Sequence, residues 1–524
     1  MIRHIPEGVF PFDDCGYART PLIPFAEQAI ALDCLCDSGA PALELRGASA
    51  SVPKAVPLRE NRWRFELPPF QSAASLEYRF VRGEEHTAWF PVDVLRRVRV
   101  AAAAGTGAGW LRLHENVYLN FSFAGASFST VLADHPEEAA PARNGDWTVE
   151  LGEPGLWRVR RDGKIIAACR EIELGLRADG SVAWHALTVD GAQTRVWGTG
   201  ERFDHVNQQG HGTCGKVVEH FTRQGQWAYL PTPFFLTDAG FGFYRDAACD
   251  VEMTFGSSIR IASRALPGRR DTWLLGAPAE LLNAYLRLTG EPALPPEWAF
   301  GLWISANGWS CDADVDEQLE ALAKYDCPAS VMVLEAWSDE STFYHWGGAW
   351  KNPKRMIQKV RDAGLHMVLW QIPVLKAVKD CADAETVRRD REEAAAKGWA
   401  IHHADGAPYI IPERWFEGSM LPDFTSPEAC EWWFSRREHL LRDGVEGFKT
   451  DGGEFLFGSD FLLRDGTPGV EAHNLYATQY VRAYNEWMRR QGVNGVTFSR
   501  AGYAGAQTVP VHWAGDQLST WEEM

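Results

Sequence analysis

The sequence has no long apolar run and none of the cysteine clusters that mark common secreted or zinc-binding proteins. No stretch of about 18 uncharged apolar residues occurs, and the first residues, "MIRHIPEGVFPFDDCGYART", contain no apolar core of a secretory signal. These absences argue against membrane spanning and export. The ten cysteines lie apart, without the CxxC pairs of a zinc site or the density of a disulfide scaffold. Reduced thiols of this kind predict a cytoplasmic location.

Motifs for nucleotide, metal and serine chemistry are missing as well. No G-x-G-x-x-G opens a helix after a strand, no Walker A pattern is present, and "GTGERF" lacks the third glycine. No G-x-S-x-G supports a serine hydrolase. His402 and His403 are adjacent but lack the HxH or HExxH spacing, which favours a loop over a metal site. We therefore predict neither a metal nor a cofactor.

Basic residues are scarce relative to acidic ones. The chain has 52 Lys and Arg against 70 Asp and Glu, a formal net charge of -18, which argues against nucleic acids and acidic membranes as partners. Its 23 tryptophans suggest a small carbohydrate partner, because flat sugar faces stack on indoles, although most tryptophans are simply core residues. Homo-oligomer formation is left open.

The periodicity of the chain changes near residue 295. Residues 1–295 show short alternating runs such as "SLEYRFVR" and "GDWTVELG", broken by Gly, Pro and Asp, which predict an N-terminal antiparallel β-sandwich domain. The proline-rich segment "EPALPPEWAFGLW" marks the boundary, and residues 296–524 then alternate helical stretches with short buried strands.

The second half predicts a parallel β/α domain with a loop-rich insertion near 376–425. Its strand signals are "FGLWIS", "SVMVLEAW", "HMVLWQIP", "VEGFKTD", "GVTFSR" and "VHWAGD". Such units form either a (β/α)8 TIM barrel or an open doubly wound sheet, and the missing phosphate motifs favour the barrel. Because a barrel needs eight strands, we predict an incomplete barrel and a truncated portion of a longer enzyme.

Two aspartates follow predicted strands at the end where barrel chemistry occurs. Asp451 precedes Gly452 and Gly453, which let the backbone turn sharply, and Asp516 ends "HWAGD". Two such carboxylates can cleave a glycosidic bond, one attacking the anomeric carbon and the other protonating the leaving oxygen. Either residue alone would more often cap a helix or pair with a lysine.

The flanking motifs resemble glycoside hydrolase family 31. "FKTDGGEF" is similar to the nucleophile motif of that family, and "SRAGYAGAQTVPVHWAGD" is similar to its acid/base motif. Further similarity lies in "WGTGERFD", "LPPEWAFGLWIS" and "DFTSPEACEWW", so the resemblance extends from about residue 197 to the end. It implies a retaining α-glycosidase that forms a covalent glycosyl-aspartate intermediate without a cofactor. Alternatives are a transglycosylase or lyase of the same family, or a non-catalytic carbohydrate-binding remnant.

By this resemblance Asp451 is the nucleophile and Asp516 the general acid/base. The implied substrate-binding residues are Lys449, Arg500, Trp370, Trp513, Glu335 and Asp339. Lys449 would bind a sugar hydroxyl and help keep Asp451 ionised, and the two tryptophans would form an aromatic wall. The alternatives are that Lys449 and Arg500 pair with Glu454 or Glu446, and that the tryptophans belong to the barrel core.

The sequence also departs from the family pattern. Glu335 stands where α-glucosidases usually have an aspartate, so the specificity for plain α-glucose is in doubt, and Asp339 is a second candidate ligand. The glycines after Asp451 replace bulkier residues of the family and predict a wider pocket. The later barrel motifs of the family, including a histidine that binds the sugar, have no counterpart here.

Overall fold

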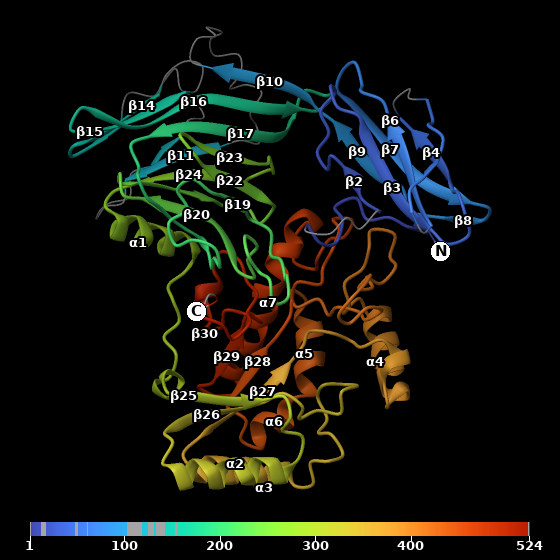
Figure 1. Ribbon diagram of the computed structural model, residues 1–524, viewed down its shortest axis with the longest axis vertical. Coiled ribbons are helices and arrows are strands. Elements are labelled where there is room, and N and C mark those ends of the chain that lie inside the picture. The colour runs from blue at the N-terminus through green and yellow to red at the C-terminus, as the bar shows by residue number, and fades with distance from the viewer. Residues whose placement is uncertain are drawn as a thin grey trace. The chain divides into compact units, whose positions relative to one another are not determined.

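The computed structural model describes residues 2–521 except 12–16, 48–50, 60, 102–117, 124–129, 133–141 and 152–155, and also residue 523. The described residues divide into two compact units (Figure 1). Unit 1 comprises Met1–Val218 and Gly225–Leu288, and unit 2 comprises Glu219–Gln224 and Thr289–Met524. The short segment 219–224 therefore belongs with the C-terminal half, although it is far from it in sequence.

The first part of unit 1 contains two antiparallel sheets that share one hydrophobic core. One sheet has five strands: β1 (Ile2–Arg3), β2 (Arg19–Thr20), β3 (Ile30–Cys36), β5 (Val56–Pro57) and β6 (Arg62–Leu67). The other has four: β4 (Ala42–Arg46), β7 (Ala74–Arg82), β8 (Glu85–His86) and β9 (Phe90–Val94). Alternate residues of β3, such as Leu32 and Cys34, are fully buried, as the period of two in a strand requires.

The second part of unit 1 has two larger sheets around a separate core. The nine-stranded sheet contains β10 (Arg96–Ala101), β13 (Ala142–Asn144), β14 (Trp147–Leu151), β15 (Trp157–Arg161), β16 (Lys164–Leu176), β17 (Val182–Gly191), β19 (Gly212–Cys214), β22 (Val251–Phe255) and β23 (Ile259–Arg264). The six-stranded sheet contains β11 (Tyr118–Phe123), β12 (Thr130–Leu132), β18 (Val196–Gly200), β20 (Pro231–Thr237), β21 (Phe241–Arg245) and β24 (Arg270–Leu275), followed by helix α1 (Pro278–Thr289). The strand pairs of these sheets are antiparallel, as predicted from the alternating sequence, except that β11 and β24 pair in parallel. The sandwich itself stays a prediction.

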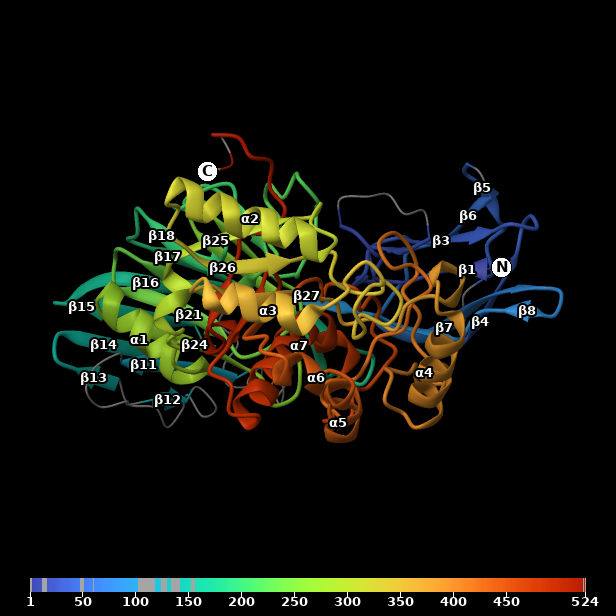
Figure 2. The ribbon, with the colours of Figure 1, turned by 90° about the horizontal axis from the view of Figure 1, so that it is seen from below.

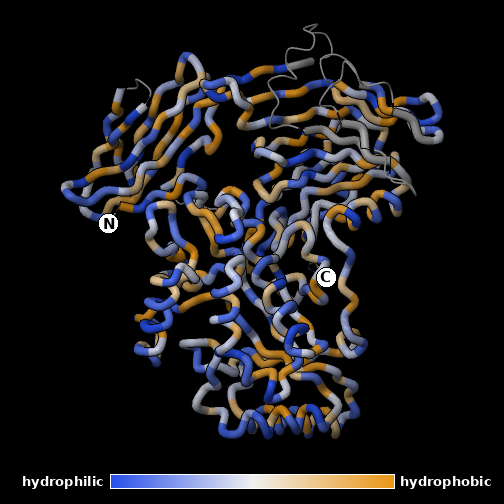
Figure 3. The backbone as a smooth tube through the Cα atoms, turned by 180° about the vertical axis from the view of Figure 1, so that it is seen from behind, coloured by the Kyte–Doolittle hydropathy of each residue, from blue (hydrophilic) through white to orange (hydrophobic). Residues whose placement is uncertain are grey.

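Unit 2 is built on a curled parallel sheet of six described strands in sequence order. They are β25 (Leu302–Ala306), β26 (Ala329–Leu334), β27 (His366–Gln371), β28 (Gly447–Thr450), β29 (Val496–Ser499) and β30 (Val511–His512). Residues Val331–Leu334 are at most 1% exposed, since parallel strands covered on both faces have continuous apolar runs. Figure 3 shows the hydrophobic stretches along these strands. All six predicted strands are present, and the incompleteness of the barrel stays a prediction.

Helices join the strands of this sheet. They are α2 (Asp312–Tyr325), α3 (Pro353–Asp362), α4 (Ala384–Ala396), α5 (Pro427–Ser435), α6 (Glu438–Arg442) and α7 (Gly469–Arg490), with short 3₁₀ turns at Glu297–Phe300, Val378–Asp380 and Ala506–Thr508. Figures 1 and 2 show α2 and α3 side by side on one face of the sheet. The side chains of Asn352 and Ser426 cap α3 and α5, and each cap precedes a proline, a combination that favours helix initiation.

Two helical segments differ from the prediction. The loop-rich insertion contains the 13-residue helix α4, whose N-cap Asp383 accepts the Thr386 N–H; the sequence expectation had placed no helix there. The segment 426–444 would suit a single helix, but Arg436 and Arg437 separate α5 from α6. The split points the Arg437 side chain inward, where it is fully buried.

Candidate active site

The carboxyl ends of the parallel strands bring the predicted site residues to one edge of the sheet, as a β/α domain requires. Glu335 follows β26, Trp370 lies at the end of β27, Asp451 follows β28, Arg500 follows β29 and Trp513 follows β30. The strands are in register here, because Trp370 pairs with Lys449 and Thr450 pairs with Ser499. The sequence therefore placed these residues on the correct edge.

The turn after Asp451 depends on its two glycines, but not because they open a pocket. Gly452 and Gly453 have φ values of +71° and +108°, a region that side chains rarely adopt. A Cβ on Gly452 would lie 2.6 Å from Ile372 Cδ1, and one on Gly453 would lie 2.8 Å from Ala477 Cβ. The prediction of a wider pocket is therefore wrong, since both positions face packed protein.

Asp451 is a buried carboxylate with well-defined N–H partners. Its Oδ2 accepts a hydrogen bond of 2.9 Å from Trp370 Nε1, and its Oδ1 accepts one of 2.8 Å from the Gly452 backbone N–H. Arg500 Nε lies 3.2 Å from the same Oδ1. These contacts fix the carboxylate in one orientation, as a positioned nucleophile needs.

Arg500 is the centre of the cluster and contacts four carboxylates. Its side chain is 1% exposed. Its Nε lies 2.9 Å from Glu454 Oε1 and its Nη2 lies 3.0 Å from Glu219 Oε1, while Nη1 donates to Asp516 Oδ2. Asp451 and Asp516, the two predicted catalytic residues, thus share one guanidinium. The Arg500–Glu454 pair that the sequence left as an alternative is present.

One cation among four carboxylates leaves an excess of negative charge. Burial raises the pKa of Glu454 to about 7, against the opposing effect of Arg500, and Glu219 and Asp451 raise it further. The pKa of Glu219 is also raised, first by burial and then by Asp451 and Asp516. The raised pKa allows the buried Glu454 carboxyl to hold a proton near neutral pH, which reduces the excess of negative charge around Arg500.

Lys449 forms an ion pair with Glu335, a partner that the sequence analysis did not name for it. Its Nζ lies 2.8 Å from Glu335 Oε1 and 4.9 Å from the centre of the Trp513 ring. Burial raises the pKa of Glu335, and Lys449 opposes the shift. The described cation that lies beside Asp451 is Arg500. The roles expected of Lys449, in binding a sugar hydroxyl and in keeping Asp451 ionised, stay predictions.

Asp339 lies in a loop that occupies its carboxylate. Its Oδ1 accepts the backbone N–H groups of Ser341, Thr342 and Phe343 at 3.0–3.2 Å, and its Oδ2 accepts the Thr342 hydroxyl at 2.9 Å. These bonds form a local turn rather than a contact with the Arg500 cluster. Its predicted role as a sugar ligand stays a prediction.

Two residues near the cluster were not predicted from the sequence. Glu219 comes from the short segment 219–224, and no spacing links it to Arg500, 281 residues later. The Trp415 ring lies 5.5 Å from the Arg500 guanidinium carbon, and its neighbours Arg414 and Phe416 have φ values of 62° and 61°. Strained backbone of this kind is typical of functional loops. In the sequence, the adjacent aromatic residues "WF" in the insertion were the signal that could have pointed to Trp415.

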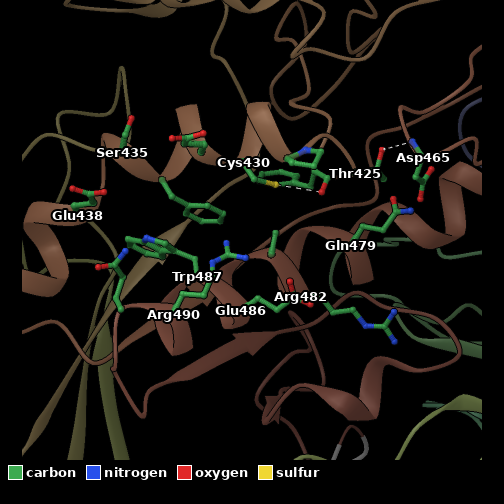
Figure 4. A pocket seen from close by; sticks show the side chains of 16 residues that line it. Thr425, Cys430, Ser435, Glu438, Asp465, Gln479, Arg482, Glu486, Trp487 and Arg490 are labelled. Carbon is green, nitrogen blue, oxygen red and sulfur yellow. Dashed lines mark hydrogen bonds between the residues drawn. The ribbon is translucent and has the colours of Figure 1, made fainter.

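Other features of the described residues are less specific. They contain no group of three or more His, Cys, Asp and Glu side chains that could hold a metal ion, and no helix long and apolar enough to span a membrane. A groove of about 700 Å³ between α5 and α7 includes Cys430, Glu438, Arg482 and Trp487 (Figure 4). None of the eight predicted site residues lines it.

Residues 292–524 match the family model described as the TIM-barrel domain of glycosyl hydrolases family 31. An isomaltosyltransferase from Sporosarcina globispora is 33% identical over 376 residues, covering 63% of this chain and 33% of that protein. A 1,3-alpha-isomaltosidase from Kribbella flavida is 28% identical over 588 residues, covering 100% of this chain and 72% of that protein. The structure of a cycloalternan-degrading enzyme from Trueperella pyogenes in complex with isomaltose superposes with a TM-score of 0.76 at 26% identity, covering 100% of this chain and 72% of that one.

The fold and the cluster thus define a parallel β/α domain with buried carboxylates gathered at the carboxyl edge of its sheet. Residues 292–524 match the barrel domain of glycoside hydrolase family 31, the family that the sequence motifs resemble. The chain spans about a third of the length of the first of these relatives.

Proposed function

We propose that the protein is a retaining α-glycosidase with Asp451 as nucleophile and Asp516 as general acid/base. The observation that carries the proposal is the shared guanidinium of Arg500, which holds both carboxylates at the carboxyl edge of the sheet. The match of residues 292–524 to the barrel domain of that family supports it.

The reaction proceeds in two displacements. Asp451 attacks the anomeric carbon while Asp516, as a carboxylic acid, gives its proton to the leaving glycosidic oxygen, forming a glycosyl ester on Asp451. Water then attacks the same carbon from the face that the leaving group vacated, and Asp516 takes a proton from it. The ester bond breaks, the sugar leaves with retained configuration, and both carboxyl groups return to their starting states.

Arg500 serves both residues in this mechanism. It holds Asp451 through Nε and Asp516 through Nη1, so it fixes the relative position of nucleophile and acid. Lys449 and Glu335, paired at 2.8 Å beside Trp513, supply a donor, an acceptor and an aromatic face next to the reacting centre. This set suits a sugar ring, which presents hydroxyl groups at its edge and an apolar face.

The substrate class that we propose is an α-linked gluco-oligosaccharide that contains isomaltosyl units. Support comes from the relatives, of which one is named for isomaltosyl transfer, one for isomaltosidase activity, and one is bound to isomaltose. The replacement of aspartate by Glu335 at a predicted sugar-binding position fits a preference other than a single α-glucose unit.

Asp451→Ala tests the nucleophile. We expect turnover of 4-nitrophenyl α-glucoside and isomaltosyl oligosaccharides to fall at least about 1,000-fold, with the thermal unfolding midpoint largely kept. A 5-fluoro-glycosyl fluoride should label the wild-type chain, and mass spectrometry should find the added sugar on the peptide that contains Asp451. Turnover that survives the substitution, or a label on another peptide, would contradict the assignment.

Glycosyl transfer is the second candidate, and the 33% identity to an isomaltosyltransferase favours it. In that case another sugar hydroxyl replaces water in the second displacement. Product analysis with and without an added acceptor oligosaccharide separates the outcomes, because only a transferase lengthens the acceptor while releasing little free sugar.

A further inference from the structure

A second buried arginine lies below the candidate active site, with incomplete hydrogen bonding. Arg437, between α5 and α6, is 0% exposed. Its Nε donates to Gln371 Oε1 at 2.7 Å and its Nη1 donates to the Trp433 carbonyl at 2.8 Å. Its Nη2 has no hydrogen-bond partner among the residues that the structure describes. An unpaired buried donor on a charged group is costly and rare in folded proteins.

The charge of Arg437 also lacks a counter-charge. No ion pair of Arg437 with a carboxylate occurs in the described part of the chain, and the groups that favour its charged form are phenols, including Tyr484 and Tyr344. The Trp433 ring lies 3.7 Å from the guanidinium carbon, which provides a cation–π contact. Burial lowers the pKa of Arg437, yet an arginine remains protonated in proteins, so a full positive charge persists here.

Arg437 lines a small cavity with an excess of positive charge. The cavity has a volume of about 10 Å³, and its charged lining residues are Lys376, Arg436, Arg437 and Asp390. Asp390 is already engaged, because it accepts the Tyr344 hydroxyl at 2.7 Å and lies 3.3 Å from Arg436 Nη2. The volume is about that needed for one water molecule or one small ion, and it excludes larger anions.

We propose that this cavity binds one monovalent inorganic anion of the size of chloride, held by the Nη2 group of Arg437. A bound halide accepts the unpaired N–H groups and supplies the missing negative charge at the same time. A water molecule would do only the first of these.

The site is connected to the edge that carries Asp451. Gln371, which accepts the Arg437 Nε–H, also accepts the Tyr484 hydroxyl at 2.7 Å through the same oxygen. The Gln371 carbonyl accepts the Asp451 backbone N–H at 2.9 Å. A bound anion would therefore stabilise Gln371, which holds the start of the turn at Asp451. The inference concerns stability and anion binding, and it does not rest on the proposed catalytic function.

The test compares sodium chloride with sodium gluconate at constant ionic strength, using thermal unfolding of the 524-residue chain. The unfolding midpoint should rise with chloride and then saturate, since a ligand of the native state stabilises it by mass action. Arg437→Met, which keeps the length of the side chain and removes its charge, should lose the chloride response. Arg355→Gln, on the exposed side of α3, removes an equal charge and should keep it.

A second measurement locates the ion directly. Crystals of the wild-type chain grown or soaked in sodium bromide should show an anomalous peak next to Arg437 Nη2, whether or not the variant folds. Equal midpoints in chloride and gluconate together with no bromide peak at Nη2 would overturn the proposal and assign the cavity to water. A chloride response that Arg437→Met retains in full would overturn it as well.

Discussion

Two buried arginines of unit 2 have opposite surroundings. Arg500, 1% exposed, contacts the carboxylates of Glu219, Asp451, Glu454 and Asp516. Arg437, 0% exposed, contacts a carbonyl, an amide oxygen and an indole ring, and forms no described ion pair with a carboxylate. The first site has too much negative charge for its cation, and the second has too little.

The difference indicates that the carboxylates around Arg500 serve chemistry and not only the burial of that arginine. A buried guanidinium can be satisfied without acids, as Arg437 shows in part through Gln371 and Trp433. Four carboxylates around Arg500 therefore exceed what satisfying that arginine requires. Burial, and after it their mutual repulsion, raises the pKa values of Glu454 and Glu219. Concentrating acids at some cost in stability is typical of functional sites.

Replacing each arginine by methionine should give the largest contrast between the two sites, measured as the pH dependence of the loss in free energy of unfolding. Arg500→Met leaves four carboxylates without their cation, so we expect a loss of about 3–5 kcal/mol in the free energy of unfolding at pH 8. The loss should be smaller at pH 5, because the carboxyl groups can then take up protons. For Arg437→Met, with no carboxylate partner, we expect little change in the loss between these pH values.

Urea unfolding of both variants at pH 5 and pH 8 checks this contrast. The wild-type chain at each pH provides the reference, and all solutions contain gluconate as the anion so that halide binding does not contribute. Equal pH dependence in the two variants would show that the carboxylates of the Arg500 cluster are not electrostatically coupled to that arginine.

Glu454→Gln should remove a pH-dependent part of the stability. Burial raises the pKa of Glu454 from 4.5 to about 7 in the folded chain, so the native state binds the proton more tightly than the unfolded state does. Stability from this group is greatest at low pH and falls as the pH rises from about 4.5 through about 7. The glutamine variant, which cannot ionise, should therefore lose less stability than wild type across that window.

Urea unfolding between pH 4.5 and pH 8 measures the effect, with Glu320→Gln on the exposed side of α2 as the matched control. The control should follow the wild-type curve. A Glu454→Gln variant whose stability falls as steeply as wild type would show that Glu454 carries no raised pKa.

The sequence predicted the elements that place the cluster, because local patterns determine them. The alternation of apolar strands and amphipathic helices gave all six strands of unit 2. The motifs around Asp451 and Asp516 placed both residues at the carboxyl edge. What these patterns cannot encode is the partner of each long side chain: Lys449 in β28 pairs with Glu335, which follows β26, two strands away in the sheet.

Long-range contacts account for the residues that sequence reasoning missed. Glu219 reaches Arg500 from a segment 281 residues earlier, and no period or motif records such a contact. The role of the two glycines after Asp451 was misjudged for a similar reason. Their sharp turn follows from composition, but the clash of a Cβ with Ile372 or Ala477 depends on packing between distant parts of the chain.

Glu219→Gln should give the smallest effect, because this side chain is 17% exposed and the amide oxygen can still accept from Arg500 Nη2. Removing one negative charge lowers the repulsion on the remaining carboxylates. Under the proposed mechanism, both limbs of the profile of kcat/KM against pH should move to lower pH by about half a unit. Measuring that profile for Glu219→Gln and Glu454→Gln side by side ranks the two carboxylates. A shift to higher pH in Glu219→Gln would mean that Glu219 acts by holding Arg500 in position and not through its charge.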